Sequence, residues 1–97
     1  MYNKLKGEIL IFEYDINKSN INKKKHGIDF ESVQDIFKEK NISITKAKTS
    51  DLEERYALIG TFDKKCYTVI FTFRGSNIRI ISARRCRKNE KQRINYD

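Results

Sequence analysis

The sequence predicts an α+β fold, a single domain over residues 1–97 with a mainly antiparallel sheet, two N-terminal helices and a C-terminal helix. Apolar residues at helical spacing occur early in the chain, whereas strand-like runs joined by short turns fill residues 54–83. The chain has no proline, no internal repeat and no low-complexity linker, so nothing in it indicates a second domain.

A strand and a helix are expected first. Glu8–Tyr14 is a short apolar run with aromatic and β-branched residues, which is typical of a strand. Asp15 suits the N-cap of a helix over residues 16–25, and Gly27 suits the left-handed conformation that ends a helix. This helix has few apolar residues, so we expect it at the surface.

A second helix is expected after Asp29, which can cap it. Its apolar residues recur with the 3.6-residue period: Phe30, Val33, Ile36 and Phe37. This helix should pack on the sheet.

The remainder should form strands and a last helix. A polar loop at Thr49–Asp51 separates a weak strand from three stronger ones. The basic segment Arg84–Tyr96 has a composition typical of a helix. The predicted strands cover residues 42–44, 54–61, 66–73 and 78–83.

Charge is uneven along the chain. Lys and Arg number 21 against 13 Asp and Glu, a net charge of +8. Residues 57–97 carry ten basic and three acidic side chains, whereas residues 31–56 carry five and six. Such a basic excess indicates a nucleic acid or an acidic protein as partner.

Cys66 and Cys86 could form one disulfide, but neither has a second Cys or His at a metal-ligand spacing. We therefore expect no zinc site and no cofactor. The N-terminal run carries charges unlike those of a signal peptide, and no apolar run approaches the ~20 residues that span a bilayer. These observations predict a soluble, cytoplasmic protein without a membrane partner.

The basic block Lys23-Lys24-Lys25-His26-Gly27 holds the single histidine. An imidazole can accept a proton, and the adjacent lysines favour a polyanion. The block is equally typical of a helix that ends in solvated basic residues. Lys18, Asn22 and Lys25 are aligned along one side of the predicted helix.

The last predicted strand places arginines among isoleucines. Strict alternation puts Arg79 on one face and Arg84 on the other. A buried, unpaired Arg79 would be costly, so it must reach solvent, a phosphate or an acid, and pairing with Glu54 across the sheet is the ordinary alternative. Ser82 lacks the turn and the partners of a nucleophilic serine.

Metal-free RNA cleavage needs a base for the 2′-hydroxyl, cations for the charge on phosphorus and an acid for the leaving oxygen. Glu54 or His26 could be the base, and His26 or a lysine the acid. The candidate cations are Arg55, Arg79 and Arg84.

Several blocks also keep a familiar order and spacing: Phe12-Glu13-Tyr14-Asp15, Lys25-His26-Gly27-Ile28, Glu54-Arg55 and Arg79-Ile80-Ile81-Ser82-Ala83-Arg84, with Glu90 and Tyr96 beyond. Together they resemble the BrnT family of bacterial type II toxins, although Tyr14 stands where tryptophan is common. The resemblance implies a RelE-like fold and an endoribonuclease that halts translation without metal. It also implies a BrnA-like antitoxin with a ribbon-helix-helix domain, through which alone the complex would bind operator DNA.

By position, the resemblance assigns two sets of residues. The catalytic candidates are His26, Glu54, Arg55 and Arg79, and the RNA-binding candidates are Lys18, Lys25 and Arg84. Two alternatives remain: a nucleic-acid-binding regulator without catalysis, and a degenerate toxin that only binds its antitoxin.

Overall fold

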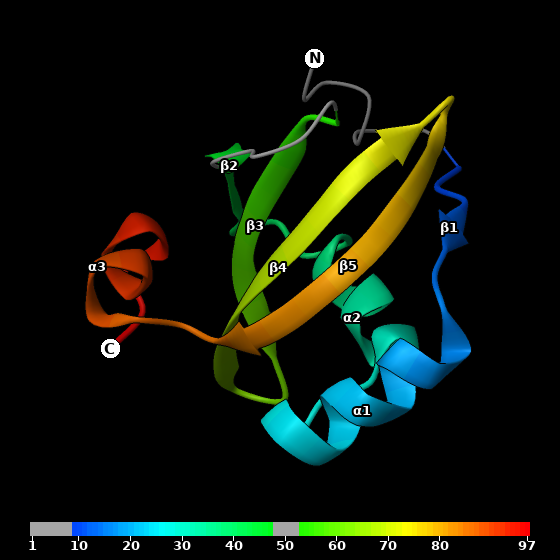
Figure 1. Ribbon diagram of the computed structural model, residues 1–97. Helices are drawn as coiled ribbons and strands as arrows, with labels where there is room; N and C mark the ends of the chain where they lie inside the picture. The colour runs from blue at the N-terminus through cyan, green and yellow to red at the C-terminus, as the bar shows by residue number, and fades with distance from the viewer. Residues whose placement is uncertain (1–8, 48–52) are drawn as a thin grey trace.

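The computed structural model describes residues 9–47 and 53–97. Figure 1 shows a sheet with helices on both sides, in which the strand order is β1-β5-β4-β3-β2. The pair β1–β5 is parallel and the other pairs are antiparallel. The elements are β1 (Phe12–Glu13), α1 (Ile16–His26), α2 (Phe30–Ile36), β2 (Ser43–Ala47), β3 (Arg55–Phe62), β4 (Lys65–Arg74), β5 (Asn77–Arg85), α3 (Lys88–Lys91) and the short 3₁₀ helix η2 (Gln92–Ile94). The predicted α+β fold is confirmed.

The sheet lies between two unequal layers. Helices α1 and α2 cover one face, and the main core forms there from Phe30 and Val33 of α2 against Leu58, Val69 and Phe71 of the sheet. On the other face, α3 and η2 lie against one end of the sheet only. This second contact is a small cluster around Ile59, Cys66 and Ile94. Within residues 9–47 and 53–97, no other helix packs on this second face.

The termini of α1 follow the predicted signals. The Asp15 carboxylate accepts from the backbone N–H groups of Asn17 and Lys18 at 2.8 and 3.1 Å, and Gly27 ends the helix with φ of 80°. The α1 residues buried against the fold are polar, Ser19 and Asn22. Helix α1 is therefore held by hydrogen bonds more than by apolar burial.

The Asn22 side chain forms hydrogen bonds with the backbone at the edge of β5. Strand β1 pairs with β5 only opposite Ile78 and Arg79, so the edge of β5 beyond them lacks a strand partner. The Asn22 amide donates to the Ala83 and Ile28 carbonyls at 3.0 and 2.8 Å and accepts from the Ala83 N–H at 3.2 Å. Asn22 is thus buried and structural, unlike the exposed Lys18 and Lys25 with which helical spacing had aligned it.

Two predicted elements differ in extent, and a third cannot be compared with the described residues. The strand predicted over Glu8–Tyr14 is confined to two residues, because only these pair with β5. Helix prediction over Arg84–Tyr96 is wrong at its start, since Arg85 still pairs with Tyr67 in the sheet and α3 begins at Lys88. The predicted loop Thr49–Asp51 lies outside the described residues, as does Glu8.

Cys66 and Cys86 form a disulfide, with their Cα atoms 5.4 Å apart. It joins the start of β4 to the segment between β5 and α3. The Cys86 N–H also donates to the Cys66 carbonyl at 3.0 Å, and both residues pack in the small cluster with Ile94. The disulfide therefore attaches the C-terminal segment to the sheet.

Candidate functional site

A β-bulge in β5 determines which side chains share a face. Phe71 in β4 pairs with Ile80, but the preceding Ile70 pairs with Ser82, so Ile81 is an extra residue in β5. Alternation therefore shifts by one after Ile80, and side chains that strict alternation separates come to lie on the same face.

The bulge corrects the predicted faces of β5. Arg79 pairs with Thr72 and Arg84 with Thr68, and these two threonines lie on the same side of β4. Arg79 and Arg84 therefore share the face turned away from α1 and α2. Ile80 and Ala83, on either side of the bulge, both point into the main core.

We call this surface the arginine face. Its middle is a row of half-buried residues in register across four strands: Thr45, Ala57, Ile70 and Ser82. Its cations are Arg55, Arg79 and Arg84. Arg55 belongs to it because it lies two residues before Ala57 in β3. The result is a floor with Ala57 and Ile70 at its centre, bordered by three guanidinium groups.

At one end of the arginine face, Arg84 is held in a closed network with Glu90 of α3. Two parallel hydrogen bonds of 2.8 Å join the guanidinium to the carboxylate. The same carboxylate accepts from Thr68 Oγ1 at 3.0 Å and from the Arg87 N–H at 2.7 Å. The Arg84 hydrogen bond, with smaller contributions from Arg87 and Thr68, lowers the pKa of Glu90 to about 2. Glu90 is therefore a fixed anion that orients Arg84.

At the other end, Arg79 pairs with Glu13 and not with Glu54, the partner that the sequence suggested. It forms an ion pair with Glu13 of β1, with Nη1 and Oε1 3.6 Å apart and side-chain exposures of 29% and 33%. Asn77 Nδ2 donates to the other Glu13 oxygen at 3.3 Å. Arg79 is therefore paired on one side and open to solvent on the other.

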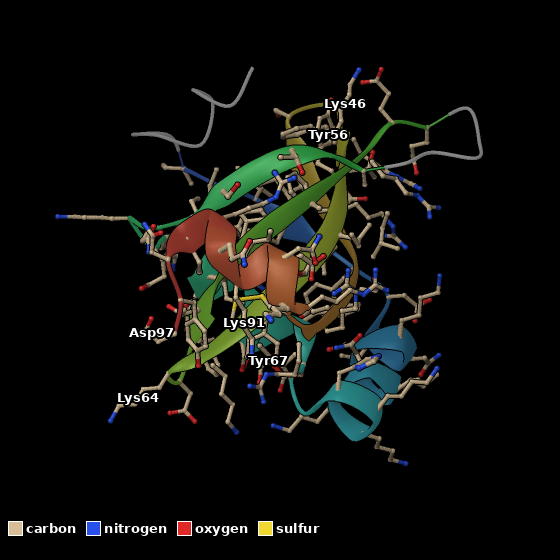
Figure 2. All side chains as sticks on the ribbon, turned by 90° about the vertical axis from the view of Figure 1, so that its left-hand side faces the viewer. Lys46, Tyr56, Lys64, Tyr67, Lys91 and Asp97 are labelled. Carbon is tan, nitrogen blue, oxygen red and sulfur yellow. A yellow bond between two sulfur atoms is a disulfide. The ribbon has the colours of Figure 1, made fainter. Side chains whose placement is uncertain are left out.

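Glu54 lies away from these arginines. Its carboxylate accepts from Lys46 Nζ and from the Tyr56 hydroxyl, both at 3.1 Å. Tyr56 belongs to the main core, so the Glu54 side chain lies on the helix side of the sheet, opposite to that of Arg55. Figure 2 shows Lys46 beside Tyr56 at the end of the sheet where β3 begins. Hydrogen bonding by Lys46 lowers the pKa of Glu54, and hydrogen bonding by Tyr56 adds to the effect.

His26 and the two lysines lie on a third part of the surface. His26 is the last residue of α1, and Lys18, Lys25 and His26 are all exposed. The last turn of α1 lies near the end of the sheet opposite to the start of β3 (Figure 1). The structure therefore gathers Arg55, Arg79 and Arg84 on one face and does not bring His26 and Glu54 together.

Sequence reasoning missed two acids that determine this geometry. From the sequence, Glu13 and Glu90 are singled out only among the residues that resemble the BrnT family, and neither of them is assigned a role. A local signal for Glu90 exists: it lies three residues after Arg87 and accepts from the Arg87 N–H, as in a capping box. For Glu13 the sequence gives no such signal, because its partner Arg79 comes from the other half of the chain.

A cluster of arginines on one sheet face of a small α+β domain is typical of proteins that bind or cleave nucleic acid. Residues 14–90 match the family model described as "Ribonuclease toxin, BrnT, of type II toxin-antitoxin system". The chain belongs to the BrnT family. Among curated proteins, no match was found.

Two further observations concern the described residues. No helix within them is long and apolar enough to cross a membrane. Within the same ranges, no three His, Cys, Asp or Glu side chains lie close enough together to hold a metal ion.

Proposed function

We propose that this protein is an active endoribonuclease toxin that cuts RNA on the arginine face without a metal ion. Its cleavage of RNA would inhibit translation and growth in the cytoplasm. The observation that carries the proposal is the common placement of Arg55, Arg79 and Arg84 around the floor formed by Ala57 and Ile70.

The arginine face suits a single-stranded RNA chain. Guanidinium groups bind phosphate oxygens in a fixed planar geometry, and a half-buried apolar floor accepts the flat face of a base. Attack on a phosphodiester adds negative charge to the phosphate oxygens in the transition state. Arg79 and Arg55 would stabilise that charge, and Arg84, oriented by Glu90, would contact the neighbouring backbone.

The proposed roles of the other residues follow from their positions. Lys18 and Lys25 are exposed on α1 and would attract the RNA chain beyond the face. His26 and Glu54 remain our candidates for proton transfer, and each would need the RNA to extend past the edge of the arginine face.

Type II systems pair a toxin with a protein antitoxin, and we propose a BrnA-like ribbon-helix-helix protein in that role. A net charge of +8 favours an acidic partner segment over the same basic surface that would hold RNA. Neutralisation would then result from competition for the cations, and operator DNA would be bound only through the antitoxin.

The test is cleavage of a single-stranded RNA by purified protein in excess chelator, beside a DNA oligonucleotide of the same sequence. We expect RNA products that end in a 2′,3′-cyclic phosphate, and an intact DNA strand because it lacks the 2′-hydroxyl. Cleavage only after Mg²⁺ addition would contradict metal independence. Binding without cleavage under any condition would favour the regulator instead.

Induced expression in cells extends the test. Growth arrest that is relieved by the neighbouring gene product supports a toxin with a cognate antitoxin. No arrest, together with a stable complex between the two proteins, would favour a degenerate toxin. Retained toxicity in both His26→Ala and Arg79→Ala would contradict our residue assignment.

A further inference from the structure

Two glutamates form ion pairs with the cations of the arginine face, and they differ in their capacity to take a proton. Glu90 pairs with Arg84, and Glu13 pairs with Arg79. An ionised carboxylate has about four lone-pair sites. A general base on this face needs one of these sites free and within reach of the substrate.

The Glu90 carboxylate is held by four hydrogen bonds. Oε1 accepts from Arg84 Nη1, Thr68 and the Arg87 N–H, and Oε2 accepts from Arg84 Nη2. Its side chain is 15% exposed, and its pKa is lowered to about 2. A carboxylate in this state is a weak base and an inaccessible one.

Glu13 has the opposite environment. It lies opposite Arg79 in the parallel β1–β5 pair, and the preceding Phe12 packs into the main core, so the Glu13 side chain is on the arginine face. One of its oxygens meets Arg79 at 3.6 Å, and the other accepts from Asn77 at 3.3 Å. Each oxygen keeps a second lone pair, and the side chain is 33% exposed.

Two other acids near this end of the sheet, among the residues that the structure describes, are placed less well. Glu54 accepts from Lys46 and Tyr56 on the helix side of the sheet. Glu53 pairs with Arg74 at 3.5 Å, next to the β4–β5 turn and beyond the row that holds Arg79.

We infer that Glu13 is the general base of the proposed RNA cleavage. A Glu13 oxygen takes the proton of the 2′-hydroxyl, and the 2′-oxygen forms a bond to the adjacent phosphorus. The bond from phosphorus to the 5′-oxygen breaks, and that oxygen leaves with a proton from water. The products are a 2′,3′-cyclic phosphate and a 5′-hydroxyl, and Glu13 gives its proton to the hydroxide that remains.

The Arg79–Glu13 pair would supply two groups that this reaction needs, a cation for the phosphate and a base for the 2′-hydroxyl. The guanidinium can hold a phosphate oxygen with the nitrogens that do not meet Glu13, and the carboxylate then lies beside the sugar that carries the 2′-hydroxyl. The two side chains come from adjacent strands in register, so their separation is fixed by the sheet. The inference rests on the proposed ribonuclease function and assigns the base within it.

The competing role for Glu13 is purely electrostatic, as the acid that neutralises Arg79. The variant Glu13→Gln separates the two, because the amide oxygen still accepts from Arg79 and Asn77 but is not basic. It also removes a negative charge from a phosphate-binding face, so RNA affinity should not fall. Glu13→Asp retains a carboxylate and serves as the conservative variant.

The experiment measures single-turnover cleavage of RNA, and binding of an uncleavable 2′-O-methyl oligonucleotide, for the full chain. The matched control is Glu39→Gln, the same change at an exposed glutamate beyond α2. We expect Glu13→Gln to lower the cleavage rate about 10²- to 10⁴-fold, the usual contribution of a general base, with unchanged or tighter binding. Glu13→Asp should recover part of the rate, and Glu39→Gln should match the unmodified protein.

Cleavage by Glu13→Gln at the rate of the control would overturn the inference, and so would a loss of cleavage matched by an equal loss of binding. Melting curves for all variants identify any that fail to fold, and recovery in Glu13→Asp distinguishes lost basicity from lost structure. If the unmodified protein cuts no RNA, the proposed function falls and the inference with it. If it cuts RNA and Glu13→Gln does too, the inference alone falls.

Discussion

The arginine face has two arginine–glutamate pairs that contain the same chemical groups but differ in how closely those groups meet. Arg84 and Glu90 meet through two hydrogen bonds of 2.8 Å, whereas Arg79 and Glu13 approach only to 3.6 Å. Glu90 comes from α3, which covers one end of the face, and Glu13 comes from a two-residue strand at the edge of the sheet.

The difference indicates two uses for one kind of ion pair. A carboxylate that accepts four short hydrogen bonds, as Glu90 does, stabilises the fold and fixes the direction of its arginine. A carboxylate with lone pairs open leaves both partners available to a ligand. Proximity of opposite charges therefore does not identify a structural pair, and the number of occupied acceptor sites is the better guide.

The largest expected effect comes from the loose pair. Arg79→Ala should reduce RNA cleavage about 10²- to 10³-fold, because a cation that faces the developing charge is lost. Thermal stability should change little, since a part-exposed ion pair contributes only about 0–1 kcal/mol. Lys38→Ala is the matched control, because it breaks another loose pair, with Asp35 at 3.9 Å. Cleavage by Arg79→Ala at the control's rate would contradict the assignment.

The second prediction concerns Asn22, which binds the edge of β5 at Ala83. Asn22→Ala removes the partners of the Ala83 N–H and of the Ala83 and Ile28 carbonyls. We expect a loss of about 2–4 kcal/mol in the free energy of unfolding, measured by urea denaturation, because these groups are left buried without partners. Ser19→Ala, which removes only the acceptor of the Phe30 N–H, should cost less. Equal losses would argue against this role for Asn22.

The Arg84–Glu90 pair should make the free energy of unfolding depend on pH. The pKa of Glu90 falls from the usual 4.5 to about 2 on folding, so its stabilisation is present above about pH 4.5 and is lost as the pH falls toward 2. Over that range the unmodified protein should lose about 1–2 kcal/mol more than Glu90→Gln, allowing for solvent screening. Parallel pH profiles for the two proteins, measured by chemical denaturation, would show that the network does not stabilise the fold.

The smallest effects should come from the lysines outside both pairs. Lys18→Ala and Lys25→Ala should each weaken RNA binding a few-fold and lower the slope of log affinity against log salt by about 0.7. The cleavage rate at saturating RNA should not change. A large loss of rate in either variant would extend the active surface from the arginine face onto α1.

Local features of the fold were accessible from the sequence. Asp15 and Asp29 cap their helices, and Gly27 ends α1, because each acts on backbone groups within a few residues. The order of helices and strands followed from hydrophobic periods for the same reason.

The arrangement of the site was not accessible, because it depends on pairing across the sheet. The extra residue Ile81 is invisible until β5 is aligned with β4, and this residue alone decides whether Arg79 and Arg84 share a face. Likewise, the sequence suggests Glu54 as the partner of Arg79, because Glu54 is nearer in the chain than Glu13. The sheet instead places Glu13 beside it.

The pairing of the first strand with the last also has a consequence for synthesis. Glu13 and Asn77, which meet at this end of the arginine face, are 64 residues apart in the chain. A growing polypeptide that has not yet reached β5 holds neither Arg79 nor Arg84 and lacks the strand on which β1 aligns. The proposed ribonuclease activity would therefore begin only after β5 has been synthesised and has paired with β1.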